Sequence, residues 1–277
     1  MPMRVALVQL NASDDPAANL PVTLGFLNEA ADSGAEIALT PEVTNCVSAS
    51  RSRQAAVLRD EADDATLPAI RDLAAKRGIW VLIGSLALKG GADGRFVNRS
   101  FLIAPDGAVV ARYDKMHMFD VSISEVETYR ESAGYAPGDR AVIAGAAGAM
   151  LGLTICYDLR FPYLYRHLAQ SGAEVLTVPS AFAPDTGAAH WETLLRARAI
   201  ETGSFVLAPA QCGTHAAAEG RARRTHGHSL AIDPWGRILA DGGDLPGVTP
   251  VDLDLSAVKD VRGRLPSLTH DRIFEGP

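Results

Sequence analysis

The residue with the clearest chemical potential is Cys156, in the stretch "MLGLTICYDLRFP" (150–162). An apolar run ends at this cysteine, and Phe161-Pro162 then opens a segment that reads as a helix, because its first positions tolerate proline. A thiol just before a helix N-terminus lies near the positive end of the helix dipole, which favours the reactive thiolate. Cysteine is also among the most buried residue types, so an inert thiol at a strand end is an equally good interpretation of this stretch alone.

A nucleophilic cysteine needs a base and a group that stabilises an oxyanion, and two ionisable residues fit those roles. Glu42 follows Pro41 at the end of the strand-like run "EIALTPE", and Lys115 ends the run "AVVARYDK". Sites in open α/β sheets assemble at strand ends, so these side chains could converge with Cys156. Taken singly, each charge is typical of a solvated strand cap.

The elements that would position these residues alternate between strand and helix. Apolar and β-branched runs predict strands at 4–10, 36–42, 79–88, 152–156, 173–180 and 204–211, with two more inside 99–115. Helical spacing predicts helices at 16–35, 64–78, 161–172 and 189–203. This order, mixed with hairpins, predicts an α/β layered fold with a mixed sheet. We expect one domain at 3–256, followed by a C-terminal helix and tail at 257–277.

Two segments carry more specific expectations. The helix at 16–35 has apolar residues at Leu20, Leu24, Leu27 and Ala31 and should end at Gly34. The polar segment 116–140 reads as a long irregular loop, and a loop of that length is usually functional.

Composition narrows the class of protein. With 21% charged residues and a net charge of −7, the chain is typical of a soluble globular protein and offers no nucleic-acid surface. Its apolar runs are strand-length and its N-terminus is no signal peptide, so we expect no membrane association. Three cysteines predict no disulfide framework and a cytoplasmic protein. "HGH" (226–228) lacks a third metal ligand, and the basic stretch "RARRTHGH" (221–228) is expected to rim the active site or a subunit contact.

Three motifs together resemble the signatures of the nitrilase superfamily of carbon–nitrogen hydrolases. They are "LTPE" around Glu42, "YDKMHMFD" around Lys115 and "LTICYDLRFP" around Cys156. The resemblance extends over nearly the whole chain. It implies a four-layer α-β-β-α sandwich with mixed sheets and no metal or organic cofactor.

The resemblance also implies a role for each residue. Cys156 would attack an amide carbon and form a thioester, Glu42 would act as the general base, and Lys115 would donate to the oxyanion. The backbone N–H of Tyr157 would be a second donor, and Glu131, in "YRES", would hold Lys115 or the leaving group.

The stretches 178–213 and 226–236 are similar to the branch that hydrolyses deaminated glutathione, with the omega-amidases that act on alpha-ketoglutaramate and succinamate close by. Such substrates are small carboxylated amides, and Arg160 is the nearest cation to Cys156 in sequence. A salt bridge from Arg160 to Asp158 is an equally good interpretation. Further candidates for substrate binding are Ser180, Thr186 and His190.

Two positions depart from the pattern of the family: Tyr163 replaces an acid in "RFPY", and Ser124-Glu125 replaces Pro-Gly. An N-carbamoyl amino acid hydrolase or a nitrilase would use the same three residues, and a non-catalytic interaction protein is the remaining alternative. The resemblance implies a homodimer or higher homo-oligomer, with the helices around 161–168 and 189–200 as its surface.

Overall fold

Two six-stranded mixed sheets form the centre of the protein, in a computed structural model that describes residues 2–124 and 127–276. The first sheet has the order β16-β1-β2-β3-β4-β5. Its strands are β1 (Met3–Gln9), β2 (Ile37–Leu39), β3 (Trp80–Leu88), β4 (Val97–Ile103), β5 (Val109–Asp114) and β16 (Gly247–Leu253). The second has the order β15-β14-β11-β10-β9-β8. Its strands are β8 (Val142–Ala146), β9 (Ala149–Leu153), β10 (Val175–Thr177), β11 (Phe205–Ala208), β14 (Leu230–Ile232) and β15 (Ile238–Asp241).

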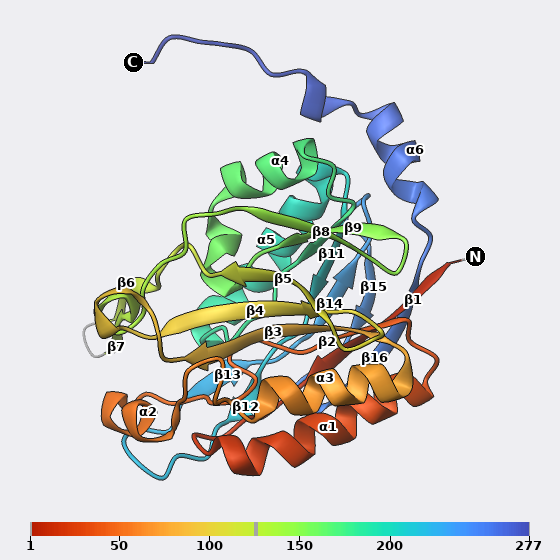
Figure 1. The fold of residues 1–277 in the computed structure, drawn as a ribbon. Coiled ribbons are helices and arrows are strands. Elements are labelled where there is room, and N and C mark those ends of the chain that lie inside the picture. Colours follow the sequence, from red (N-terminus) through yellow and green to blue (C-terminus); the bar gives the residue numbers. More distant parts are fainter. Residues whose placement is uncertain (1, 125–126, 277) are drawn as a thin grey trace.

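Helices cover the outer face of each sheet, as Figure 1 shows: α1 (Pro16–Asp32) and α3 (Thr66–Arg77) on the first, α4 (Pro162–Gln170) and α5 (Pro184–Thr202) on the second. Successive side chains of β1 point in opposite directions, so Ala6 and Val8 pack against α1 and α3, and Val5 and Leu7 pack toward the second sheet. Because both faces are buried, the strands are continuous apolar runs. The expected four-layer α-β-β-α sandwich is confirmed.

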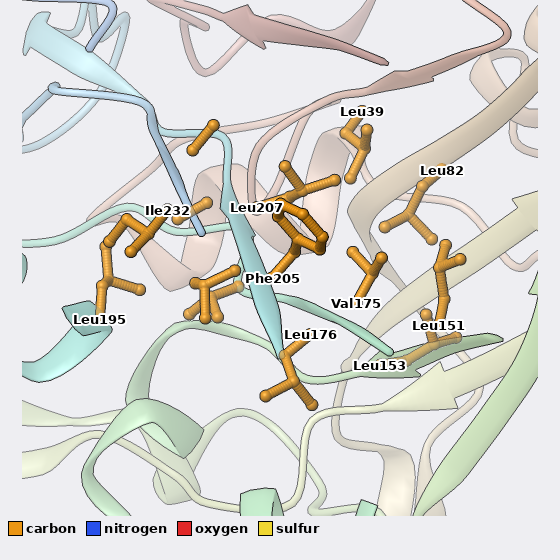
Figure 2. Close-up of a cluster of buried hydrophobic side chains, with 14 of the residues drawn as sticks. Leu39, Leu82, Leu151, Leu153, Val175, Leu176, Leu195, Phe205, Leu207 and Ile232 are labelled. Atoms are coloured by element: carbon orange, nitrogen blue, oxygen red, sulfur yellow. The ribbon is translucent and has the colours of Figure 1, made fainter. Parts of the chain in front are cut away.

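The central apolar layer lies between the sheets. Figure 2 shows Leu39 and Leu82 of the first sheet opposite Leu151 and Val175 of the second, all of them at most 1% exposed. Complete burial of each such side chain contributes roughly 1.5–3 kcal/mol of transfer free energy. This layer fixes the distance between the two sheets and therefore between residues that follow strands of different sheets.

Both sheets repeat one pattern of strand direction. In the first, β1, β2 and β3 are parallel and β16, β4 and β5 are antiparallel to their neighbours. In the second, β9, β10 and β11 are parallel and the outer strands are antiparallel. Glu42 follows β2, Lys115 follows β5 and Cys156 follows β9. All three therefore leave carboxyl ends of strands.

Helix α1 differs in phase from its apolar pattern. Its fully buried residues are Asn19, Thr23, Leu27 and Ala30, whereas Leu20 and Leu24 are only half-buried. The amide of Asn19 accounts for this rotation, because it bonds the backbone of Ser13 and the carbonyl of Asn45. Hydrogen bonding of one buried amide thus sets the helix face where periodicity suggested otherwise.

The segment 116–140 is more regular than expected. It contains the antiparallel pair β6 (Asp120–Ser124) and β7 (Glu127–Arg130), followed by a 3-10 turn at Glu131–Ala133. The prediction of an irregular loop is therefore wrong; Glu125, one of the two positions that depart from the family pattern, lies outside the described residues.

The remaining elements are short. They are α2 (Arg51–Val57), β12 (Cys212–Thr214), β13 (Arg224–His226), α6 (Ser256–Arg264) and 3-10 turns at Ala92–Gly94, Cys156–Arg160 and Ser267–Thr269. The division of the chain after residue 256 stays a prediction. Among the described residues, no helix is both long and apolar enough to cross a bilayer.

Candidate active site

Glu42 lies in a buried turn directly after β2, with 5% of its surface exposed. Its Oε1 accepts from the Nζ of Lys115 at 2.9 Å and from the Nδ2 of Asn98 at 2.9 Å. Its Oε2 accepts from the backbone N–H of Ala181 at 2.9 Å, and its carbonyl accepts from Gln211 at 3.0 Å. Three donors therefore fix the orientation of this carboxylate, and a fourth holds the backbone of the same residue.

Lys115 is the centre of the charged cluster and is only 2% exposed. Besides Glu42, its ammonium bonds both carboxylate oxygens of Glu131, at 3.0 and 2.9 Å. Glu131 is held in turn by the backbone N–H of Phe119, 2.6 Å from its Oε2. Two carboxylates thus surround the ammonium of the lysine, which is how a buried cation is stabilised.

Cys156 follows β9 and has φ +49°, in the left-handed region that non-glycine residues rarely occupy. Its backbone N–H donates to the carbonyl of Pro179 at 3.0 Å, and its thiol lies close enough to Glu42 for the carboxylate to affect its pKa. The strained turn directs the side chain into the cavity beside Glu42 and Lys115, and such strain persists only where the surrounding structure imposes it.

The protonation states follow from burial and from the lysine. Burial raises the pKa of Glu42, but the charge and hydrogen bond of Lys115 outweigh it, so the pKa of this carboxyl lies below its usual value. Burial lowers the pKa of Lys115, yet Glu131 and Glu42 raise it well above its ordinary value. Burial and then the charge of Glu42 raise the pKa of the Cys156 thiol. The resting cluster is therefore carboxylate, ammonium and neutral thiol.

The prediction that a helix N-terminus favours a thiolate at Cys156 is wrong for this fold. A 3-10 turn, Cys156–Arg160, separates the thiol from α4, which begins only at Pro162. Burial and the charge of Glu42 raise the pKa of this thiol instead of lowering it.

Asp158 organises the turn after Cys156 and is completely buried. Its Oδ2 accepts from the hydroxyl of Tyr113 at 2.7 Å and from the backbone N–H of Ile155 at 2.8 Å. Its Oδ1 accepts from the backbone N–H and the Nδ1 of His117. The Nε2 of His117 contacts the hydroxyl of Tyr163, the residue that departs from the family pattern. Asp158 thereby joins β5, the lysine segment and the cysteine turn.

A cavity of about 770 Å³ opens onto this cluster. Glu42, Lys115, Cys156, Tyr157 and Glu131 all contribute to its wall, so the structure brings the predicted catalytic and supporting residues together. Cys46, 1% exposed, also lines it. Its other walls come from α2, β7, the start of α5 and the basic stretch that precedes β13.

The predicted substrate-binding residues are placed less uniformly. The wall, as far as the described residues define it, includes Thr186 but not Arg160, Ser180 or His190. Arg160 packs over the rings of Tyr157 and Phe182, and its guanidinium lies 3.3 Å from the Nδ1 of His190.

Ser180 has no exposed surface, and its hydroxyl donates to the carbonyl of Val178. A substrate therefore cannot reach it. The carboxylate of Asp158 accepts hydrogen bonds from Tyr113 and His117, and no ion pair joins it to Arg160 among the described residues.

Metal binding finds no support in the part of the chain that the structure describes, since no group of three or more His, Cys, Asp or Glu side chains is arranged to hold an ion there. His226 and His228 instead stack on each other with ring centroids 4.9 Å apart, and His228 pairs with Asp241 at 3.0 Å.

Two residues of the site were missed by sequence reasoning. Asn98 is a buried amide inside the apolar strand β4, and a polar residue in such a run was the available signal. Asp158 stands two residues after the cysteine, and the sequence gives no sign that its charge is completely buried.

Comparison with known proteins decides the family. Residues 4–263 match the profile of a protein family described as "Carbon-nitrogen hydrolase". The chain belongs to this family. The "Deaminated glutathione amidase" of Yersinia enterocolitica is 37% identical over 271 residues, 97% of this chain and 92% of the relative.

Solved structures of other proteins share the fold. The NitFhit protein of C. elegans superposes with a TM-score of 0.88 at 33% identity, covering 98% of this chain but 65% of that longer protein. An amidase variant from Nesterenkonia sp. AN1, 30% identical over 95% of each chain with a TM-score of 0.77, was solved with the acetamide moiety of fluoroacetamide covalently added at its active-site cysteine.

Proposed function

We propose that the protein is an amidase that cleaves the C–N bond of a small carboxylated amide through a thioester on Cys156. The observation that carries this proposal is that Cys156 lines the same cavity as the hydrogen-bonded pair of Glu42 and Lys115. A relative whose active-site cysteine carries a covalently added acetamide moiety supports a nucleophilic role for this cysteine.

In the first half-reaction the Cys156 sulfur attacks the amide carbon while Glu42 accepts the thiol proton. Because the resting thiol is neutral, the proton moves during attack, as general-base catalysis requires. Lys115 and the backbone N–H of Tyr157 stabilise the oxyanion. Glu42 then returns the proton to the leaving nitrogen, and ammonia or an amine departs.

In the second half-reaction Glu42 removes a proton from water, and the hydroxide attacks the thioester carbon. The C–S bond breaks, the proton on Glu42 returns to the sulfur, and the acid product loses its own proton to solvent and leaves as a carboxylate. Glu131 holds the ammonium of Lys115 in place through both steps, with two hydrogen bonds of 3.0 and 2.9 Å.

Deaminated glutathione is the first substrate that we propose, on the support of the Yersinia relative. An omega-amidase activity on alpha-ketoglutaramate or succinamate is the second. An N-carbamoyl amino acid hydrolase, a nitrilase and a non-catalytic interaction protein remain as alternatives that the same test separates.

The test is a substrate panel followed by two readouts. The protein is mixed with deaminated glutathione, alpha-ketoglutaramate, an N-carbamoyl amino acid and a nitrile, and released amine or ammonia is measured beside intact protein mass. We expect turnover with a carboxylated amide and an acyl adduct that disappears in Cys156→Ala.

Cys212→Ala is the matched control, because that buried thiol lies in β12, apart from the Glu42–Lys115 cluster. Undiminished turnover by Cys156→Ala would exclude the mechanism, and the absence of any turnover or adduct would favour an interaction protein.

We also propose a cytoplasmic homodimer. Tyr163 on α4 and Ile200 on α5 are 64% and 52% exposed, which supports an interface on these helices. Light scattering of Ile200→Arg should show monomers if this surface forms the dimer.

A further inference from the structure

Arginines dominate the wall of the cavity outside the Glu42–Lys115–Glu131 cluster. Five of them stand against one acid, Asp185, although the whole chain carries a net charge of −7. They are Arg51, Arg130, Arg221, Arg223 and Arg224. Such a local reversal of charge attracts an anionic ligand.

These guanidinium groups have no acidic partner within the described side chains. Arg51 nevertheless is engaged, because it bonds Gln54 and the carbonyls of Arg130 and Glu131 and lies over the ring of Tyr135. Arg223 is half-buried, and within the described part of the chain its side chain makes one hydrogen bond, from its Nη2 to the carbonyl of Ala181 at 3.3 Å. Most of the five N–H donors of Arg223 thus remain for a ligand.

Arg223 and the proposed general base, Glu42, both hydrogen-bond the backbone of the same residue, Ala181. The carbonyl of Ala181 accepts from Arg223, and the N–H of the same residue donates to Oε2 of Glu42. The positive charge of Arg223 is also close enough to lower the pKa of Glu42, after the larger effects of burial and Lys115. Arg223 therefore reaches the cavity at the level of the reacting atoms.

The backbone around Arg223 is firmly held. Its carbonyl accepts from the N–H of His215, which closes the hairpin of β12 and β13. The buried His215 ring bonds the carbonyl of Ala12 through Nδ1 and Thr225 through Nε2, each at 2.7 Å.

The segment between β12 and β13 is anchored as well, beside α2 (Figure 1). Asp14 accepts from the N–H groups of Ala218 and Glu219, and the Glu219 carboxylate accepts from the hydroxyl of Ser50. A binding residue on such a fixed segment loses little conformational freedom when a ligand arrives.

We propose that Arg223 binds the carboxylate of the acyl part of the substrate, a few bonds from the amide carbon, and so selects carboxylated amides. This inference rests on the proposed amidase function and deepens it. The planar guanidinium matches a carboxylate with two parallel hydrogen bonds, and the other arginines of the wall favour the approach of the anion. Arg160 has no part in this binding.

The first test compares two amides that differ in one charge. Succinamate carries a carboxylate where butyramide carries a methyl group. We expect Arg223→Gln to lower the ratio of kcat/KM for succinamate over butyramide by about 30-fold or more, and Arg223→Lys to restore part of it. Taking the ratio removes any change in Glu42, which affects both amides equally.

Arg237→Gln and Arg160→Gln are compared with Arg223→Gln in the same assay. Arg237 is 75% exposed and pairs with Asp233, so its loss should leave the ratio as in the wild type. An unchanged ratio in Arg223→Gln, or the large loss in Arg160→Gln instead, would overturn the proposal.

The second test needs no turnover and therefore separates this inference from the proposed function. Binding of 2-oxoglutarate to Cys156→Ala is measured by calorimetry, with Arg223→Gln or Arg237→Gln added. We expect about 30-fold weaker binding only with Arg223→Gln. Equal binding by both double variants, or no binding to Cys156→Ala at all, would refute the role of Arg223 even if the protein is an active amidase. If Arg223→Gln weakens the binding of 2-oxoglutarate but the wild type hydrolyses no amide, Arg223 is an anion-binding residue and the proposed amidase function is excluded.

Discussion

Asp158 accepts two hydrogen bonds from His117: its Oδ1 lies 3.1 Å from the backbone nitrogen and 2.6 Å from the Nδ1 of the histidine. A buried carboxylate only accepts, so the Nδ1 of His117 donates to Asp158, and its Nε2 lies against the hydroxyl of Tyr163. His117 stands two residues after Lys115, and Asp158 stands two residues after Cys156. The pair therefore fixes the nucleophile segment against the segment of the oxyanion donor.

Replacing Asp158 with asparagine should damage both stability and catalysis. The carboxylate accepts from four donors, and an amide would point its own N–H groups at some of them. We expect a loss of about 2–4 kcal/mol in the free energy of unfolding and roughly a tenfold lower kcat. Urea denaturation and kinetics well below the melting temperature measure the two effects. Asp139→Asn, at a side chain 92% exposed, is the control, and equal behaviour of the two variants would contradict the role.

Removing the buried cation should be costly in a pH-dependent way. Lys115→Met leaves Glu42 and Glu131 without their shared partner, which should cost about 3–5 kcal/mol. In the wild type the lowered pKa of Glu42 adds stability at neutral pH that is lost as pH falls. Without the lysine, burial should raise that pKa, so stability should be lost as pH rises instead.

Urea midpoints at about pH 5 and about pH 7.5 test this reversal of sign. Adding Glu131→Gln to Lys115→Met removes one of the two carboxylates and should recover part of the loss at the higher pH. A Lys115→Met protein that keeps the wild-type dependence on pH would show that the carboxylates do not depend on this lysine.

The reactivity of Cys156 toward iodoacetamide should report its neighbours. Because burial and Glu42 raise the pKa of this thiol, the alkylation rate should still be rising above about pH 8.5, the ordinary pKa of cysteine. Glu42→Gln should move the profile to lower pH while abolishing amide hydrolysis. Peptide mass mapping assigns the adduct, with Cys156→Ala as the background; a profile unaffected by Glu42→Gln would exclude this electrostatic coupling.

His215 should make the protein sensitive to mild acid. Burial lowers the pKa of this imidazole to about 4, below its unfolded value of about 6.5. The neutral ring is therefore favoured in the folded state, and stability is lost as pH falls from about 6.5 toward 4, by up to about 3 kcal/mol. Denaturation midpoints of the wild type and His215→Gln should converge with acid, whereas a constant gap would contradict the assignment.

The sequence was most informative where local chemistry decides the structure. Apolar runs that stop at Pro41-Glu42, Lys115 and Cys156 identified three strand ends, and the fold brings those ends to one cavity. The helix α3 ends at Gly78 as predicted, with φ +64°. Backbone rules of this kind depend on neighbouring residues alone.

Long-range contacts explain what the sequence could not show. The face of α1 depends on the bonds of Asn19, one of which reaches the carbonyl of Asn45, 26 residues away. Arg160 is close to Cys156 along the chain, but the 3-10 turn between them carries it onto Tyr157 and Phe182 instead of the cavity. Arg223 is 67 residues from Cys156 (223 − 156) and is brought back by the β12–β13 hairpin.

Strand β16 affects the order in which this protein folds during synthesis. It pairs along its full length with β1, from Met3 opposite Leu253 to Gln9 opposite Gly247. The first sheet, which carries Glu42 and Lys115, is thus completed only after residue 253 has been translated. A chain still growing on the ribosome lacks β16. Cys156 is therefore synthesised well before the sheet that positions Glu42 and Lys115 is complete. The hydrolase should therefore acquire its activity in one late event.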